Sequence, residues 1–138
     1  MAIRWLLYYT CFSSYPDEKI NITRKRGACD YGIYNYDTVS ERPWGSYYKL
    51  YQEKGVWVKR VAVDPGCRLS LQKHHKRSEK WIIVCGSGMV LINGVEVTVH
   101  TGSVVDVPVG SEHRIGNIGK EKLVFIEVAC GEYLGEDD

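Results

Sequence analysis

Four side chains that could bind a divalent metal lie close enough in the sequence to be considered together. The stretch from residue 69 to residue 81, LSLQKHHKRSEKW, contains Gln72, His74 and Glu79, and His113 lies further along the chain. One amide oxygen, two imidazoles and one carboxylate form a mixed nitrogen and oxygen donor set that suits zinc, manganese, iron, cobalt or nickel. The spacing alone leaves open whether these residues bind a metal or are ordinary polar strand residues, and Gln72 stands where a metal site more often has a histidine.

The elements that must hold these side chains are predicted to be β-strands. From Trp44 onward, short runs rich in Val, Ile, Tyr and Trp are broken by Gly, Pro and Asn, a pattern typical of an all-β sandwich or barrel. Asn93-Gly94 is the strongest hairpin signal, because both residues tolerate the positive φ of a type I′ turn. The strands are expected at 47–52, 56–63, 68–74, 79–85, 89–92, 95–99, 104–107, 113–115 and 123–128. We expect them to close into a jelly roll or small barrel, which shields the strand edges and encloses an interior that polar side chains can enter.

One face of the predicted strand 68–74 carries only polar side chains, because alternate residues point the same way: Arg68, Ser70, Gln72 and His74. If this strand faced solvent, Leu69 and Leu71 on its other face would belong to the core. The opposite assignment is favoured by Glu79, which follows after a short turn, and by a histidine supplied from a distant segment. We therefore expect the polar face, or part of it, to point into the barrel.

Length, charge and cysteine content limit the classes of function. A chain of 138 residues forms one domain by the usual size range. Eighteen basic and seventeen acidic residues give a net charge of +1, which provides no overall field for nucleic acid or a membrane surface. The basic residues around Lys76 and Arg77 are interpreted as a solvated turn. Because of this charge, we expect that the protein binds neither nucleic acid nor membrane. Five cysteines without a CxxC pair indicate reduced thiols, so we expect a cytoplasmic protein.

The composition changes near residue 40. Residues 1–40 show no sustained helical or alternating pattern and are interpreted as an N-terminal extension of unclear structure. This extension either packs on the domain or on a partner subunit, or is a loosely ordered leader. Residues 41–138 are predicted to form the β-domain.

Two spaced motifs resemble those of the cupin superfamily. Gly66-x5-Gln72-x-His74-x4-Glu79-x6-Gly86 resembles the first motif, with Gln72 in the place of its first histidine. Gly102-x5-Pro108-x-Gly110-x2-His113-x3-Asn117 matches the second motif. The resemblance implies a double-stranded β-helix and one metal ion bound by Gln72, His74, Glu79 and His113.

A narrower resemblance covers residues 41–138. The segments ERPWGSY (41–47), PGCRLSLQ (65–72), IEV (126–128) and YLGEDD (133–138), with His113-Arg114, are similar to the type II mannose-6-phosphate isomerase domain. In that family the domain commonly forms the C-terminal part of a bifunctional enzyme that also makes GDP-mannose. The Gly-rich nucleotidyltransferase opening is absent from this sequence, so only the isomerase half is carried over. The resemblance implies interconversion of mannose 6-phosphate and fructose 6-phosphate with a divalent metal, of which zinc is expected first.

Such an isomerase needs a cationic group for the phosphate and a base. Arg68 is the first candidate for contact with the substrate and for a catalytic role, because its forked guanidinium suits phosphate. Further candidates for substrate binding are Ser70, Lys80 and Arg114, although relatives usually have histidine at the position of Lys80. Glu127 is a candidate base, because a carboxylate is unusual in the apolar run 123–128. The alternatives are a strand charge that faces solvent or pairs with an arginine, and a metal-bound water as the base.

Two further expectations rest on analogy with cupins. A homodimer is expected, because cupin barrels commonly pair through their sheets. The alternative function is a non-catalytic, metal-containing cupin that binds a sugar or a sugar phosphate.

Overall fold

The computed structural model describes residues 39–135 and 137–138. Of these residues none lies in an α-helix, so the described part of the chain has no helix that could span a membrane. Its strands are β1 (Ser40–Arg42), β2 (Gly45–Glu53), β3 (Val56–Val63), β4 (Gln72–Lys73), β5 (Arg77–Cys85), β6 (Ser87–Ile92), β7 (Val95–His100), β8 (Val104–Val107), β9 (Glu112–Asn117) and β10 (Leu123–Gly131). The predicted all-β fold is confirmed. The predicted N-terminal extension lies outside the described residues, apart from the short segment 39–40.

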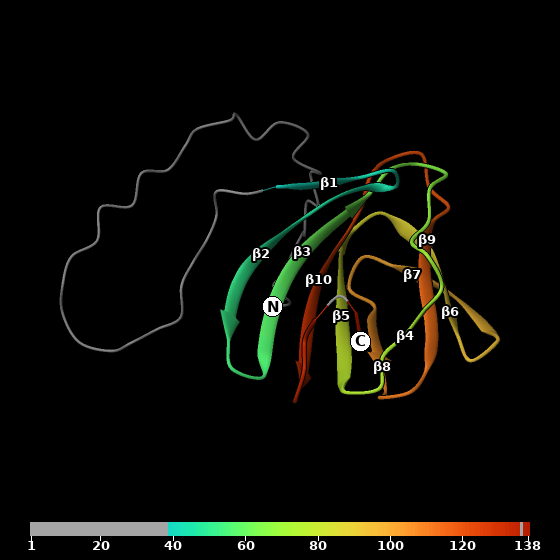
Figure 1. Cartoon of the computed structure of the whole chain (residues 1–138). Helices are drawn as coiled ribbons and strands as arrows, with labels where there is room; N and C mark the ends of the chain where they lie inside the picture. Colours follow the sequence, from blue (N-terminus) through green and yellow to red (C-terminus); the bar gives the residue numbers. More distant parts are fainter. Residues whose placement is uncertain (1–38, 136) are drawn as a thin grey trace, which may run out of the picture. The chain divides into compact units, whose positions relative to one another are not determined.

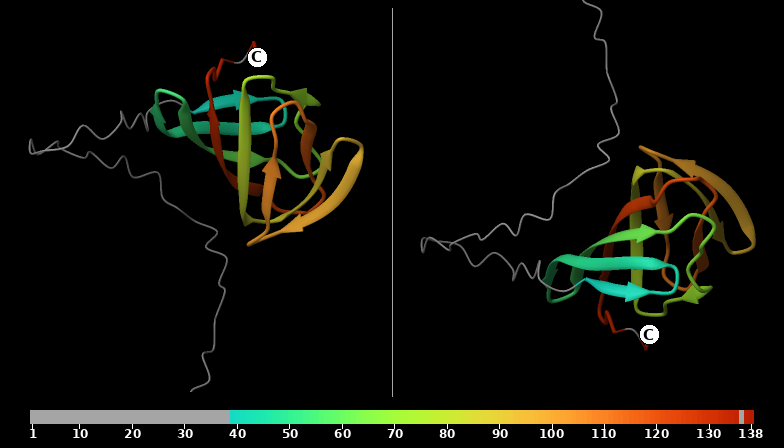
Figure 2. Two further views of the ribbon diagram at one scale, coloured as in Figure 1. Left: turned by 90° about the horizontal axis from the view of Figure 1, so that it is seen from below. Right: turned by 90° about the horizontal axis from the view of Figure 1, so that it is seen from above.

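The strands form two antiparallel sheets that face each other (Figure 1). The larger sheet has the order β1-β2-β3-β10-β5-β8, and the smaller has the order β4-β9-β6-β7. Seen from below and from above, the two sheets curve around a common interior (Figure 2). This arrangement is the predicted jelly-roll barrel, and its interior is where inward-pointing side chains from both sheets can meet.

The turns follow the predicted chemistry. Asn93 and Gly94 have φ angles of 48° and 81°, and they join β6 to β7 as the type I′ signal predicts. Eight of the predicted strands coincide with β2, β3 and β5 to β10, most of which extend slightly further than predicted. Strand β1 was not predicted.

The predicted strand 68–74 is wrong. Only Gln72 and Lys73 form a strand there, and Arg68 makes an isolated bridge to Gly116. The side chains do not alternate, because Leu69 packs against the core whereas Leu71 is 52% exposed. The expected polar face therefore does not exist as a continuous ladder.

The interior is apolar over most of the barrel. Full burial of a single large aliphatic or aromatic side chain stabilises the fold by about 1.5–3 kcal/mol. The buried cluster is made of Val61, Val63, Trp81, Ile83, Val90, Val99, Val105, Val107, Ile115, Leu123 and Phe125.

The inner face of the larger sheet becomes charged toward one end. Val61 and Phe125 lie directly opposite each other in β3 and β10, and both are buried. Two residues further along these strands, Lys59 lies directly opposite Glu127, and both are buried as well. Because side chains two residues apart share a face, a charged row borders the hydrophobic core inside the barrel.

Candidate metal centre

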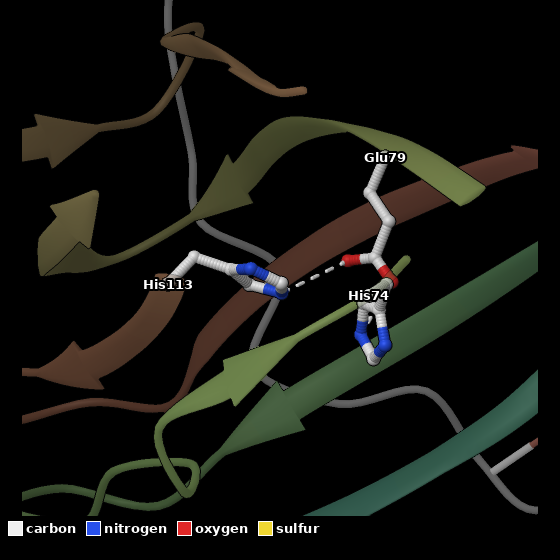
Figure 3. Close-up of side chains that lie close together, drawn as sticks. All are labelled: His74, Glu79 and His113. Carbon is white, nitrogen blue, oxygen red and sulfur yellow. Dashed lines mark ion pairs between the residues drawn. The ribbon is translucent and has the colours of Figure 1, made fainter. Parts of the chain in front are cut away.

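A cluster of two histidines and one glutamate bridges the two sheets inside the barrel. His74 lies between β4 and β5, Glu79 lies in β5, and His113 lies in β9. One potential ligand atom from each residue lies within 4.8 Å of the others, and all three side chains are buried (Figure 3). The three residues are those that the sequence pattern grouped as metal ligands together with Gln72.

Strand geometry explains why these side chains converge. In β5, Arg77, Glu79, Trp81 and Ile83 are all buried and share the inner face. The backbone oxygen of His74 accepts a hydrogen bond from the amide of Gly110 at 2.7 Å. This bond ties the segment after β4 to the turn that leads into β9.

The carboxylate of Glu79 is held from several sides. Oε2 accepts a hydrogen bond from Nε1 of Trp81 at 3.1 Å and lies 3.7 Å from Nε2 of His113. Oε1 accepts a hydrogen bond from Nε of Arg77 at 3.1 Å and lies 3.3 Å from Nε2 of His74. The two oxygens therefore each face one imidazole (Figure 3).

A backbone carbonyl group determines which ring nitrogen of His113 carries the proton. Nδ1 of His113 lies 2.9 Å from the carbonyl oxygen of Ser111, which can only accept, so Nδ1 carries the proton. Nε2 then presents a lone pair to the cluster, and it is buried without a hydrogen-bond partner among the described residues. A buried acceptor of this kind suits a bound cation, and this backbone support is typical of metal-binding histidines.

His74 is kept in the form that a metal requires. Burial lowers the pKa of His74, and the charge of Arg77 lowers it further, although Glu79 acts in the opposite direction. Nε2 of His74 lies 3.0 Å from Nη2 of Arg77, which can only donate, so Nε2 has the lone pair that an ion would use. Nδ1 then carries the proton, and it is buried without a hydrogen-bond partner among residues 39–135 and 137–138. A neutral imidazole is the metal-binding form, so the donor set fits a divalent ion.

Gln72 lies beside this cluster. Its Cα is the cross-strand partner of that of His113, so the two side chains leave the sheet on the same face. Nε2 of Gln72 donates to Oγ of Ser70 at 3.4 Å. The position is compatible with a ligand role for Gln72, which stays a prediction.

Arg77 belongs to this site, although the sequence pattern predicts that it lies in a solvated turn. Its side chain is 4% exposed, and Nη1 donates to the carbonyl oxygen of Gly135 at 2.8 Å. Gly131 lies opposite Arg77, where a Cβ would collide with the carbonyl oxygen of Lys76. The alternation of β5 could have found Arg77, because a residue two positions before Glu79 shares its face.

Glu127 points into the barrel. It accepts a hydrogen bond from Nε1 of Trp57 at 3.1 Å and lies 3.9 Å from Nζ of Lys59. Burial, followed by the negative charge of Glu79, raises the pKa of Glu127 to about 7, although Lys59, Arg77 and the Trp57 hydrogen bond oppose this shift. The alternative of a solvent-facing strand charge is therefore wrong, and the charged partner is a lysine.

The structure does not bring the four predicted substrate-binding residues into the cluster. Arg68 and Ser70 are exposed on the segment that fails to form a strand. Lys80 alternates with Glu79, so it points outward, where its Nζ lies 2.9 Å from Oδ1 of Asp106. Arg114 lies between the buried residues of β9 and is itself half-buried. Their positions do not support the roles predicted for them.

The chain matches one family model, described as "Mannose-6-phosphate isomerase C-terminal", over residues 32–138. XanB, a xanthan biosynthesis protein of Xanthomonas campestris pv. campestris (strain ATCC 33913), is 47% identical over 98 residues, which are 70% of this chain and 21% of XanB. AlgA, an alginate biosynthesis protein of Pseudomonas aeruginosa, is 44% identical over 97 residues, 70% of this chain and 20% of AlgA. The chain thus spans about a fifth of the length of these curated relatives.

Solved structures agree on the fold. The capsular polysaccharide assembling protein CapF of Staphylococcus aureus superposes with a TM-score of 0.65 at 25% identity, covering 73% of this chain and 32% of CapF. A predicted oxalate decarboxylase of Thermotoga maritima gives a TM-score of 0.60 at 27% identity, and the match covers 62% of this chain and 79% of that protein. The cupin domain of Schizosaccharomyces pombe Cnp3 gives a TM-score of 0.61 at 21% identity, and the match covers 62% of this chain and 64% of that domain. This likeness concerns the fold alone. The jelly roll is therefore a cupin barrel.

Proposed function

Because this chain belongs to the mannose-6-phosphate isomerase C-terminal family, we propose that it interconverts mannose 6-phosphate and fructose 6-phosphate with one divalent metal ion. The observation that carries the proposal is the buried cluster of His74, Glu79 and His113, in which Nε2 of His113 has no hydrogen-bond partner among the described residues. These three residues and Gln72 would hold the ion. When bound, the ion would polarise the substrate carbonyl and stabilise the negative charge that develops on the neighbouring oxygens.

The reaction also needs a group that moves a proton between adjacent carbons. In the direction of the ketose, the C2 proton of mannose 6-phosphate is removed to give a cis-enediolate and a proton is added at C1, while the hydroxyl proton of O2 passes to O1. We assign the carbon-to-carbon transfer to Glu127, which lies on the same inner face as Glu79. A carboxyl with a pKa of about 7 can accept a proton and return it near neutral pH.

The surroundings of Glu127 suit this role. The indole of Trp57 donates to one carboxylate oxygen and orients it, and Lys59 balances the charge when the proton has left. The mixed donor set favours zinc, and manganese, iron, cobalt and nickel are the other candidates.

The test is an activity assay on protein loaded with each of these metals in turn. We expect mannose 6-phosphate to be converted into fructose 6-phosphate with at least one metal, and a chelator to abolish the activity. A Glu127→Gln variant should keep its metal content and lose at least about 100-fold in kcat, the usual range for a general base. Absence of turnover with every metal, together with measurable binding of mannose 6-phosphate, would instead identify a non-catalytic sugar-phosphate-binding cupin.

A further inference from the structure

A row of charged residues crosses the inner face of the larger sheet next to the metal centre. Lys49 of β2 lies directly opposite Lys59 of β3, and Lys59 lies directly opposite Glu127 of β10. Two lysines at directly opposed positions share a face, and like charges in such a pair destabilise a sheet. The stability of the sheet therefore does not explain why two lysines lie opposite each other here.

The same end of the barrel gathers three cations around one indole ring. The centroid of the Trp57 ring lies 3.8 Å from Nζ of Lys59, 4.9 Å from Nζ of Lys49 and 5.1 Å from the guanidinium carbon of Arg77. Lys59 and Arg77 are buried, and Lys49 is half-buried. The indole stabilises each cation individually, but it does not remove the repulsion between them.

Among the described residues, the charges of this region do not balance. The buried cations of Lys59 and Arg77 are offset by the buried carboxylates of Glu79 and Glu127. Lys49 adds one positive charge, and a divalent ion on the metal centre would add two. A partly buried region with this surplus is stabilised by a bound anion, because charges out of water need an opposite charge nearby.

We propose that Lys49, Lys59 and Arg77 bind the phosphate group of the substrate, an inference that rests on the isomerase function proposed above. Arg77 links the two parts of the site, because Nε donates to Glu79 while the guanidinium carbon lies over Trp57. The substrate carbonyl lies at the metal centre, and the phosphate at the other end of the carbon chain reaches the lysines. A forked guanidinium and two ammonium groups provide the charged donors that a phosphate dianion prefers.

The test measures binding of mannose 6-phosphate and of inorganic phosphate to the metal-loaded protein by isothermal titration calorimetry. Lys59→Met and Lys49→Met keep most of the apolar stem of each side chain and remove the charge. We expect each to weaken binding of both ligands roughly 10- to 100-fold, the effect of removing one charged hydrogen bond, with metal content unchanged. Lys80→Met is the matched control, because Lys80 also lies in this sheet but pairs with Asp106 on the outer face. It should bind both ligands as the wild type does.

Two outcomes would overturn the inference: wild-type affinity for both ligands in Lys49→Met and Lys59→Met, or an equal loss of affinity in Lys80→Met. Lys49→Met keeps the test decisive if Lys59→Met does not fold, because Lys49 is only half-buried. The outcome is separable from that of the proposed function. Loss of binding in the two variants of a protein without turnover supports the phosphate site and contradicts the isomerase. Turnover with an unchanged KM in both variants supports the isomerase and contradicts the phosphate site.

Discussion

Nη2 of Arg77 lies 3.0 Å from Nε2 of His74, so a permanent cation contacts a predicted metal ligand. The same guanidinium donates to Oε1 of Glu79 at 3.1 Å. Arg77 thus neutralises the buried carboxylate, and it would share this role with an ion bound at the proposed metal centre. Loss of the Arg77 side chain is therefore expected to change both the stability of the fold and the stabilisation that a bound ion provides.

We expect Arg77→Met to destabilise the metal-free protein by about 3–5 kcal/mol, because it leaves the buried carboxylate of Glu79 without its cationic partner. Added zinc should restore stability in the variant, so the zinc-induced rise in Tm should exceed that of the wild type. Thermal unfolding with and without a chelator measures both effects. Arg60→Met is the control, because the Arg60 guanidinium contacts the ring of Tyr48 instead of the metal cluster. A zinc-induced rise in Tm no larger than that of the wild type would contradict the coupling.

The hydrogen bond from Trp81 to Glu79 predicts an effect on metal affinity. Trp81→Phe removes the donor to Oε2 and keeps an aromatic ring against Phe125 and His113. We expect metal affinity to fall about 10- to 100-fold, as is usual when a group that orients a ligand is lost. Competition with a chromophoric chelator measures the change. Trp44→Phe, in a half-buried aromatic pair with Tyr47, should leave metal affinity unchanged, and an equal loss there would point to a general packing effect.

Much of the fold and the centre of the site could be predicted from the sequence. Strands such as β3 and β8 have the predicted bounds, because alternation and turn residues act locally. His74, Glu79 and His113 were grouped correctly, because a short turn separates His74 from Glu79 and the turn Pro108-Val109-Gly110 precedes His113. Neither signal depends on distant contacts.

The other residues of the site could not be predicted, because the sequence does not show on which face of the sheet each side chain lies. Arg77 and Lys59 stand in strands whose alternate residues are buried, yet a charged residue in such a pattern is more often at the surface. The strand predicted at residues 68–74 is wrong for a different reason. There the amide of Leu69 bonds to the carbonyl oxygen of Ile115, and this tertiary contact replaces a regular ladder. Alternation alone therefore placed Arg68 on the wrong side.

The C-terminal segment predicts a stability effect next to the metal centre. The carboxylate of Asp138 accepts hydrogen bonds from the amides of His75 and Lys76, each at 3.2 Å. Asp138→Ala should destabilise the protein by about 1–3 kcal/mol, because both amides lose a charged acceptor. It should also lower metal affinity, because the segment that follows His74 loses an anchor. Asp137→Ala, whose carboxylate bonds the exposed Tyr133, should change stability by no more than about 0.5 kcal/mol. Equal effects of the two variants in urea unfolding would contradict this prediction.

Glu127 predicts a pH dependence of stability in the metal-free protein. Its pKa is raised from 4.5 to about 7, so between these values the folded protein holds a proton that the unfolded chain has released. Stability must then fall as pH rises through this interval, on the order of 3 kcal/mol in total at about 1.4 kcal/mol per pKa unit. Glu127→Gln cannot release this proton, so its stability should fall less between pH 5 and about 7.5. Urea unfolding at a series of pH values, with chelator present, measures the difference. Glu96→Gln, an exposed position on β7, should follow the wild-type curve, and a Glu127→Gln curve parallel to that of the wild type would show that Glu127 is not the titrating group.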